Sequence, residues 1–193
     1  MFRRQILRAG LGAASFMTVG LLSFSALART TASGRTFAEG AAIKLAQALR
    51  SIGCDECSES AMRLETSLRN DGSISLHARR AGLSAADAMT ISDTLQSLTY
   101  EQASSLGSFS LSYNPLIGDE GALALAPSLP DTLRELSLVG CEIKDTGGEA
   151  ILRWASKSSY LRIICNEENQ FSEHLKAQFR QLRQKNENLL VVV

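Results

Sequence analysis

The stretch LGSFSLSYNPLIGDEGALALA, residues 106–126, decides the fold of this chain. It places Leu106, Phe109, Leu111 and Asn114 at successive spacings of three, two and three residues. The same spacing recurs 27 positions later in Leu133, Leu136, Leu138 and Cys141. A Gly-, Asp- and Ala-rich stretch follows each set. Self-similarity at a fixed period indicates an array of one supersecondary unit, repeated along the chain.

Each unit has a strand half and a helix half. The alternating Phe109 and Leu111 predict a short strand with one buried face. The turn residue Asn114 can satisfy backbone groups of a neighbouring turn. Asp119 and Glu120 then favour a helix start, where negative charge is stabilising. Since no single unit buries its apolar face, stacking of the units must form the core.

These spacings match the pattern L-x-x-L-x-L-x-x-N/C, and the chain therefore resembles the leucine-rich repeat family, in its long ribonuclease-inhibitor-like subtype. The most specific stretch is Asn114–Ala122, and the clear resemblance covers residues 106–184. A looser copy lies at Ile74, Leu76 and Leu83. The resemblance implies an α/β fold class, a short solenoid with parallel strands on the concave side and helices on the convex side.

The last full repeat fits the pattern in two registers. One uses Tyr160, Ile163, Cys165 and Glu168, again 27 positions on. The other uses Leu161, Ile164, Asn166 and Asn169, in that order. The second register buries Asn166, and a buried amide without partners is costly. We therefore expect the register that starts at Tyr160.

The remaining segments frame the repeats. Residues 36–72 predict a helical N-terminal cap of two helices, and residues 29–35 a short flexible linker. The cap would shield the first strand, because an open sheet edge invites unwanted pairing. Residues 73–193 form the repeat domain, and residues 189–193 predict a terminal strand because they are rich in Val.

Residues 1–28 read as a cleavable signal peptide. A basic start, MFRRQILR, precedes an uncharged apolar run from Ala9 to Ala28 that ends in Ala-Leu-Ala. Arg3 and Arg4 with the following apolar pair resemble the twin-arginine export motif, which implies a bacterial periplasmic or secreted protein cut near Ala28. Two alternatives stay open: a mitochondrial transit peptide, and an uncleaved apolar helix that anchors the chain in a membrane.

Charge argues against nucleic-acid binding. The 193 residues carry 20 Lys and Arg against 20 Asp and Glu, a net charge of zero, whereas nucleic-acid binding needs clustered basic residues. The basic last helix predicts a solvated face. No phosphate-binding loop or nucleophile elbow is present in the sequence, and its two histidines stand alone. We expect that the protein is not an enzyme and that it has no cofactor and no metal site.

Four cysteines remain. Cys54 and Cys57 have C-x-x-C spacing and predict a local disulfide or two plain thiols; a thiol-redox function is a weaker alternative. Cys141 and Cys165 occupy packing positions of the repeat.

The partner is expected to be another protein, held on the concave face by the variable positions beside the strands. In the expected register these are Ser75, His77, Ser108, Ser110, Ser112, Tyr113, Glu135, Ser137, Arg162 and Asn166. Tyr113 and Arg162 are the best candidate anchors, since Tyr and Arg dominate binding energies. The predicted function is a non-catalytic, exported interaction module. The alternative is an assembly subunit of a membrane or mitochondrial complex, and membrane contact is expected only if the N-terminal helix is retained.

Overall fold

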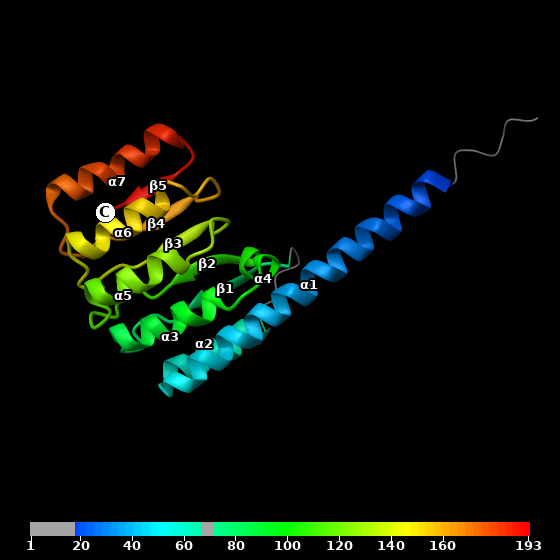
Figure 1. Ribbon diagram of the computed structural model, residues 1–193, viewed down its shortest axis with the longest axis horizontal. Helices are drawn as coiled ribbons and strands as arrows, with labels where there is room; N and C mark the ends of the chain where they lie inside the picture. The colour runs from blue at the N-terminus through cyan, green and yellow to red at the C-terminus, as the bar shows by residue number, and fades with distance from the viewer. Residues whose placement is uncertain (1–17, 67–71) are drawn as a thin grey trace, which may run out of the picture.

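A computed structural model of the chain describes residues 18–66 and 72–193, with side chains from residue 35 onwards (Figure 1). The first 17 residues of the expected signal peptide therefore lie outside the described residues. Within the described part, no helix combines the length and the apolar character that are needed to cross a membrane.

The centre of the fold is one five-stranded parallel sheet in the order β1-β2-β3-β4-β5. Its strands are β1 (Ile74–His77), β2 (Leu106–Ser110), β3 (Glu135–Ser137), β4 (Ile163–Cys165) and β5 (Leu190–Val192). Helices connect consecutive strands: α3 (Ala85–Gln96) and α4 (Tyr100–Ser104), α5 (Gly118–Leu125) with a 3₁₀ turn (Ala126–Ser128), α6 (Asp145–Ala155) and α7 (Glu173–Lys185). Figure 1 shows α3, α5, α6 and α7 stacked in the same order as the strands. The fold is thus mixed α/β, as the resemblance implied.

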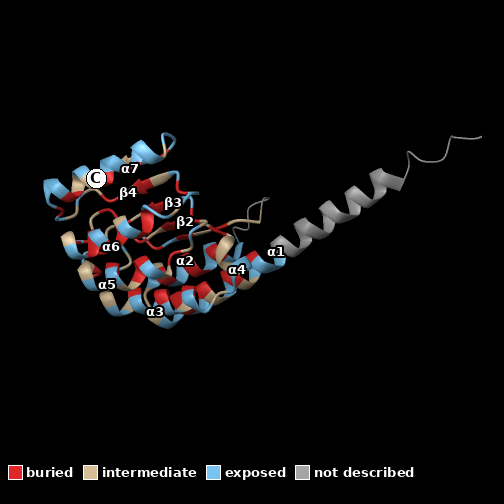
Figure 2. Cartoon of the chain, turned by 45° about the horizontal axis from the view of Figure 1, so that its top comes forward, coloured by how far each residue is buried: buried red, intermediate tan, exposed pale blue. Residues whose placement is uncertain are grey.

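One row of apolar side chains runs across the sheet and faces the helices. Parallel pairing aligns Leu76 with Phe109, Phe109 with Leu136, Leu136 with Ile164, and Ile164 with Val191. The first four of these side chains are at most 1% exposed, and they form the core together with the inner faces of the helices. Figure 2 marks buried residues in red along the strands and on parts of the helices.

The register expected for the last repeat is wrong. Leu161, Ile164 and Asn166 are fully buried, whereas Tyr160 is 58% exposed. Because strand side chains alternate with period two, the one-residue shift exchanges every side chain between the two faces. Asn166 therefore lies in the core and not at the solvent-facing position that we expected for it. Its side-chain nitrogen and oxygen have no hydrogen-bond partner, the cost on which the expected register was based.

The turns after the strands are joined by asparagine side chains. Asn114 Oδ1 accepts from the Leu83 backbone N–H at 3.1 Å, and its Nδ2 donates to the carbonyls of Ala78 at 2.9 Å and Leu111 at 2.7 Å. Asn169 makes the same kind of bridge to the preceding repeat, where its Oδ1 accepts from the backbone N–H of Cys141. Each amide thus satisfies backbone groups that two neighbouring repeats leave without partners.

Aspartates make a second connection at the helix starts. Asp119 Oδ1 accepts from the backbone N–H groups of Lys144 at 2.9 Å and Gly147 at 2.8 Å. A Cβ at Gly147 would lie 2.7 Å from this oxygen, so the close approach requires glycine. One repeat later, Asp145 Oδ1 accepts from the backbone N–H of Ser172 at 2.7 Å. This hydrogen bond lowers the pKa of the Asp145 carboxyl.

Two helices precede the sheet, α1 (Thr18–Ile52) and α2 (Asp55–Thr66). The structure continues α1 through residues 29–35, where we expected a flexible linker. That segment contains no proline and only one glycine, so its backbone can remain helical. Leu49 of α1 and Leu64 of α2 are buried in the core. Ser60 Oγ on α2 donates to the carbonyl of His77 at 2.7 Å, and this hydrogen bond fixes α2 against β1.

Candidate protein-binding face

The second face of the sheet is turned away from the helices and is here called the open face. Its residues alternate with the buried row and form two aligned rows of their own. The first row is Ser75, Ser108, Glu135, Ile163 and Leu190, and the second is His77, Ser110, Ser137, Cys165 and Val192. The open face therefore begins with polar side chains on β1 and β2 and ends with apolar side chains on β4 and β5.

Small polar side chains form a connected floor in the first half of the open face. Ser112 Oγ lies 2.8 Å from Ser137 Oγ and accepts from the backbone N–H of Val139 at 3.2 Å. Ser110 Oγ is 3.3 Å from the same Ser112 oxygen. His77 Nε2 lies 2.9 Å from Ser108 Oγ. These hydroxyls are positioned by one another, and their small size lets a ligand approach the strands closely.

Tyr113 stands at the edge of this floor, between two arginines and a glutamate. The guanidinium carbon of Arg79 lies 4.3 Å from the ring centroid and that of Arg80 lies 5.0 Å from it, both within cation–π range. The Tyr113 hydroxyl donates to Glu168 Oε1 at 3.2 Å. Tyr113 adopts a positive φ of 62°, a conformation uncommon for a residue with a side chain. The contacts hold the ring in one place.

Charge changes sign along the edge of the open face. Exposed Arg79 and Arg80 flank β1, whereas Glu167 and Glu168 follow β4. On β4, two residues before Glu167, partly exposed Cys165 has its thiol pKa raised, chiefly by burial and then by the charges of Glu167 and Glu135. Burial also raises the pKa of the Cys141 thiol, to about 11. Both thiols are therefore protonated and unreactive near neutral pH.

Most of the residues proposed from the sequence do lie together. Ser75, His77, Ser108, Ser110, Glu135 and Ser137 belong to the two rows of the open face, and Ser112 and Tyr113 follow β2 at its edge. Asn166 is excluded by its burial. Arg162 is exposed one residue before β4, and its backbone N–H donates to the carbonyl of Arg134.

The sequence reasoning missed other residues of this face. Arg79 and Arg80 contact the Tyr113 ring and were not among the residues proposed from the sequence. Ile163 and Cys165 join the open face because of the shifted register. The presence of Asn169 at a turn position was the signal that could have revealed this shift, because it matches Asn114 of the earlier repeat.

Among the side chains that the structure describes, no three His, Cys, Asp or Glu residues gather closely enough to hold a metal ion. Cys54 and Cys57 form a disulfide, with Cα atoms 5.1 Å apart. These two sulfurs lie at the junction of α1 and α2, outside the open face.

Comparison with known families supports the repeat. A family model described as Leucine Rich repeat matches residues 102–126 and 131–152. The first segment contains β2 and α5, and the second contains β3 and most of α6. A search of curated proteins found no match to the chain. The matched segments support a leucine-rich repeat, a class of domain that commonly mediates protein–protein interaction and is generally non-catalytic.

Proposed function

We propose that this chain is a leucine-rich-repeat protein of the ribonuclease-inhibitor-like subtype whose open face is non-catalytic and binds another protein. In this proposal the stack is a short solenoid, the open face is its concave side, and α1 and α2 cap the edge of β1. The main support for the proposal is the Tyr113 ring, which is held by Arg79, Arg80 and Glu168. It lies beside the hydrogen-bonded serines of the open face. Rigid tyrosines and arginines dominate binding energies in protein interfaces.

The two ends of the open face favour a partner of mixed character. Arg79 and Arg80 can pair with carboxylates of the partner, while Leu190, 53% exposed, and Ile163 offer apolar contact. Such an arrangement fixes the direction in which a partner segment lies, because its acidic end must meet β1 and its apolar end must meet β5. Between them, the partly exposed Ser110 and Ser137 can accept or donate hydrogen bonds without blocking access.

Site-specific crosslinking tests this assignment. A photoreactive phenylalanine analogue is placed at Ser110 on β2 or, as the matched control, at exposed Thr90 on α3. Irradiation in the native host should give a discrete crosslinked adduct from the Ser110 position and none from the Thr90 position. An excess of unmodified protein should compete the adduct away. Adducts from Thr90 alone, or from both positions equally, would place binding elsewhere.

We also propose export to the periplasm or the outside of a bacterial cell, with cleavage near Ala28. Among the α1 side chains that the structure describes, which begin at Arg35, the buried ones run from Ala38 to Leu49, and all of them follow the proposed cut. The mature protein should begin at Arg29 and be recovered from the periplasmic fraction. Replacing Arg3 and Arg4 by lysine should leave uncut protein in the cytoplasm. A native chain that begins at Met1 would instead support the membrane-anchored alternative.

A further inference from the structure

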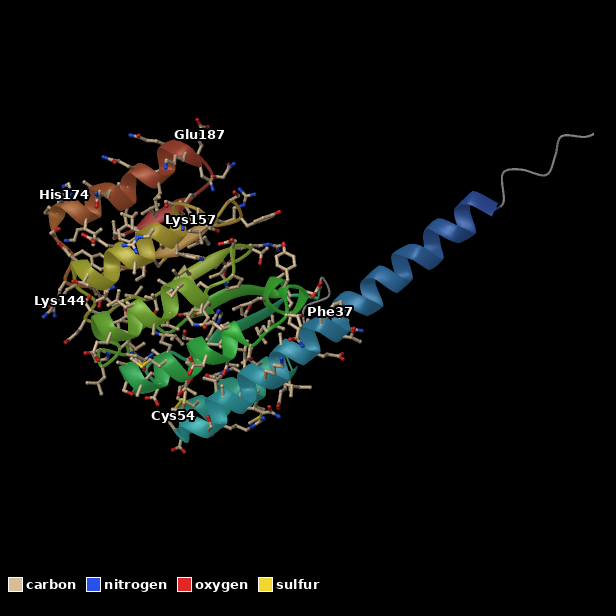
Figure 3. The ribbon with its side chains drawn as sticks, in the orientation of Figure 1. Phe37, Cys54, Lys144, Lys157, His174 and Glu187 are labelled. Atoms are coloured by element: carbon tan, nitrogen blue, oxygen red, sulfur yellow. A yellow bond between two sulfur atoms is a disulfide. The ribbon has the colours of Figure 1, made fainter. Side chains whose placement is uncertain are left out.

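We propose that the Cys54–Cys57 disulfide is a redox-active site that oxidises dithiols of other proteins. The site is independent of the proposed binding function, because it lies away from the open face. Figure 3 shows Cys54 at the junction of α1 and α2, at the opposite end of the stack from His174 on α7.

The pair occupies the start of a helix. Gly53, with φ of 81°, turns the chain after α1, Cys54 directly precedes the first residue of α2, and Cys57 lies in its first turn. The backbone N–H of Cys57 donates to Cys54 Sγ at 3.0 Å. Once the bond is reduced, this N–H and the positive end of the helix stabilise a thiolate on Cys54. A thioredoxin-like site needs such a pair at a helix start after a strand; here the pair lies at a helix start, but it follows helix α1 and not a strand.

The two sulfurs differ in access. Cys57 is completely buried in the core, whereas Cys54 is partly exposed. A thiolate from another protein can therefore reach only Cys54 Sγ, and Cys57 is the leaving group. Because only Cys54 Sγ can be attacked, exchange proceeds through a single mixed disulfide, between Cys54 and the other protein.

The bond contributes little to holding the fold together. It joins residues three positions apart within one helical turn, and so closes a loop too short to restrain the unfolded chain strongly. The junction of α1 and α2 has its own support, since Arg50 makes two hydrogen bonds with Glu65 at 2.7 and 2.6 Å. Reduction can therefore occur without unfolding.

The exchange step balances as follows. A thiolate of the partner dithiol attacks Cys54 Sγ, the S–S bond breaks, and its electron pair leaves on Cys57 Sγ, which takes up a proton. The second partner thiolate then attacks the partner sulfur of the mixed disulfide and releases Cys54 as a thiolate. The partner loses two electrons and two protons and gains a disulfide, and the Cys54–Cys57 pair gains the two electrons.

Negative charge next to Cys54 moderates the site. Asp55 and Glu56 lie in the first turn of α2 and oppose a thiolate there, although Glu56 pairs with Arg63 at 2.5 Å.

The unreactive Cys165 thiol provides an internal reference in the same chain. In the reduced protein at neutral pH, iodoacetamide should modify Cys54 about tenfold faster than Cys165. Asp55→Asn should increase the Cys54 rate further.

The decisive test uses a synthetic peptide with two cysteines. Mixed with the native protein, one reduced peptide should become oxidised for each Cys54–Cys57 pair that is reduced, as read by alkylation and mass spectrometry. Reduced Cys57→Ala should hold the oxidised peptide as a mixed disulfide, and Cys54→Ala should not. Circular dichroism verifies that each variant is folded.

A purely structural bond would behave differently. The disulfide would then resist the reduced peptide until urea unfolds the protein, and neither single-cysteine variant would accumulate a mixed disulfide. Either result overturns the redox proposal and leaves the proposed binding function of the open face untouched.

Discussion

The two faces of the sheet alternate along the same strands but carry different side chains. Phe109 and Leu136 face the helices and are completely buried, whereas their neighbours Ser110 and Ser137 face outwards. The buried face supplies the free energy of folding, because each of its side chains removes a large apolar area from water. The open face supplies little of it and can change without unfolding the protein. Residues that stabilise the fold and residues of the proposed binding surface thereby alternate along each strand.

The largest loss of stability is expected at the centre of the buried face. Phe109→Ala leaves a cavity between β2 and the helices and should lower the free energy of unfolding by about 3–5 kcal/mol. Urea denaturation followed by circular dichroism measures the change. The adjacent Ser110→Ala serves as the control, with an expected change below about 0.5 kcal/mol. Equal losses from both variants would show that the two faces are not distinct.

A smaller loss is expected at the turn that joins the first two repeats. Asn114→Ala removes the acceptor of the Leu83 N–H and the donor to two carbonyls, all in buried positions. The free energy of unfolding should fall by about 2–3 kcal/mol. A change below about 0.5 kcal/mol, measured in the same denaturation assay, would remove the bridging role of this asparagine.

A gain in stability, and not a loss, is expected when the second buried asparagine, Asn166, is replaced. Asn166→Leu replaces an amide that has no side-chain partner, and it keeps the backbone bond from the Asn166 N–H to the carbonyl of Val192. Stability should rise by about 1 kcal/mol. A loss comparable to that of Asn114→Ala would mean that the Asn166 side chain has partners in solution.

These two asparagines also explain how far the sequence could predict the fold. The leucine spacing predicted β2 and β3, because both repeats offer one register. In the last repeat, composition allows two registers, and the cost of burying Asn166 favoured the wrong one. The stack accepts that cost because the same register places Leu161 and Ile164 in the core and Asn169 at the turn. A local rule could not weigh this sum of distant contacts.

The candidate site was predictable to a similar extent. The serine positions follow directly from alternation along β2 and β3. The arginines around Tyr113 were not predictable, because Arg79 and Arg80 lie more than 30 positions earlier and meet the ring only through the pairing of β1 with β2.

A still smaller effect on stability is expected at low pH, where the Asp145 carboxyl becomes protonated. The pKa of the Asp145 carboxyl is lowered in the folded state, mainly by the hydrogen bond from the Ser172 backbone N–H. Its contribution to stability is therefore present above the ordinary aspartate pKa and is lost as pH falls through the lowered value. Asp145→Asn retains an acceptor oxygen but does not titrate, so its unfolding midpoint should fall less steeply below pH 4 than that of the wild type. Parallel acid profiles would contradict this assignment.

The most direct test of the account compares Ser110→Arg with Thr90→Arg, which add the same side chain to the open face and to helix α3. The partner recovered through the Ser110 crosslink is titrated against both variants, and their unfolding midpoints are recorded. Both midpoints should remain close to that of the wild type. Ser110→Arg should weaken binding about tenfold or more, whereas Thr90→Arg should bind like the wild type. Unchanged binding by a folded Ser110→Arg variant would contradict the claim that the open face is the binding surface.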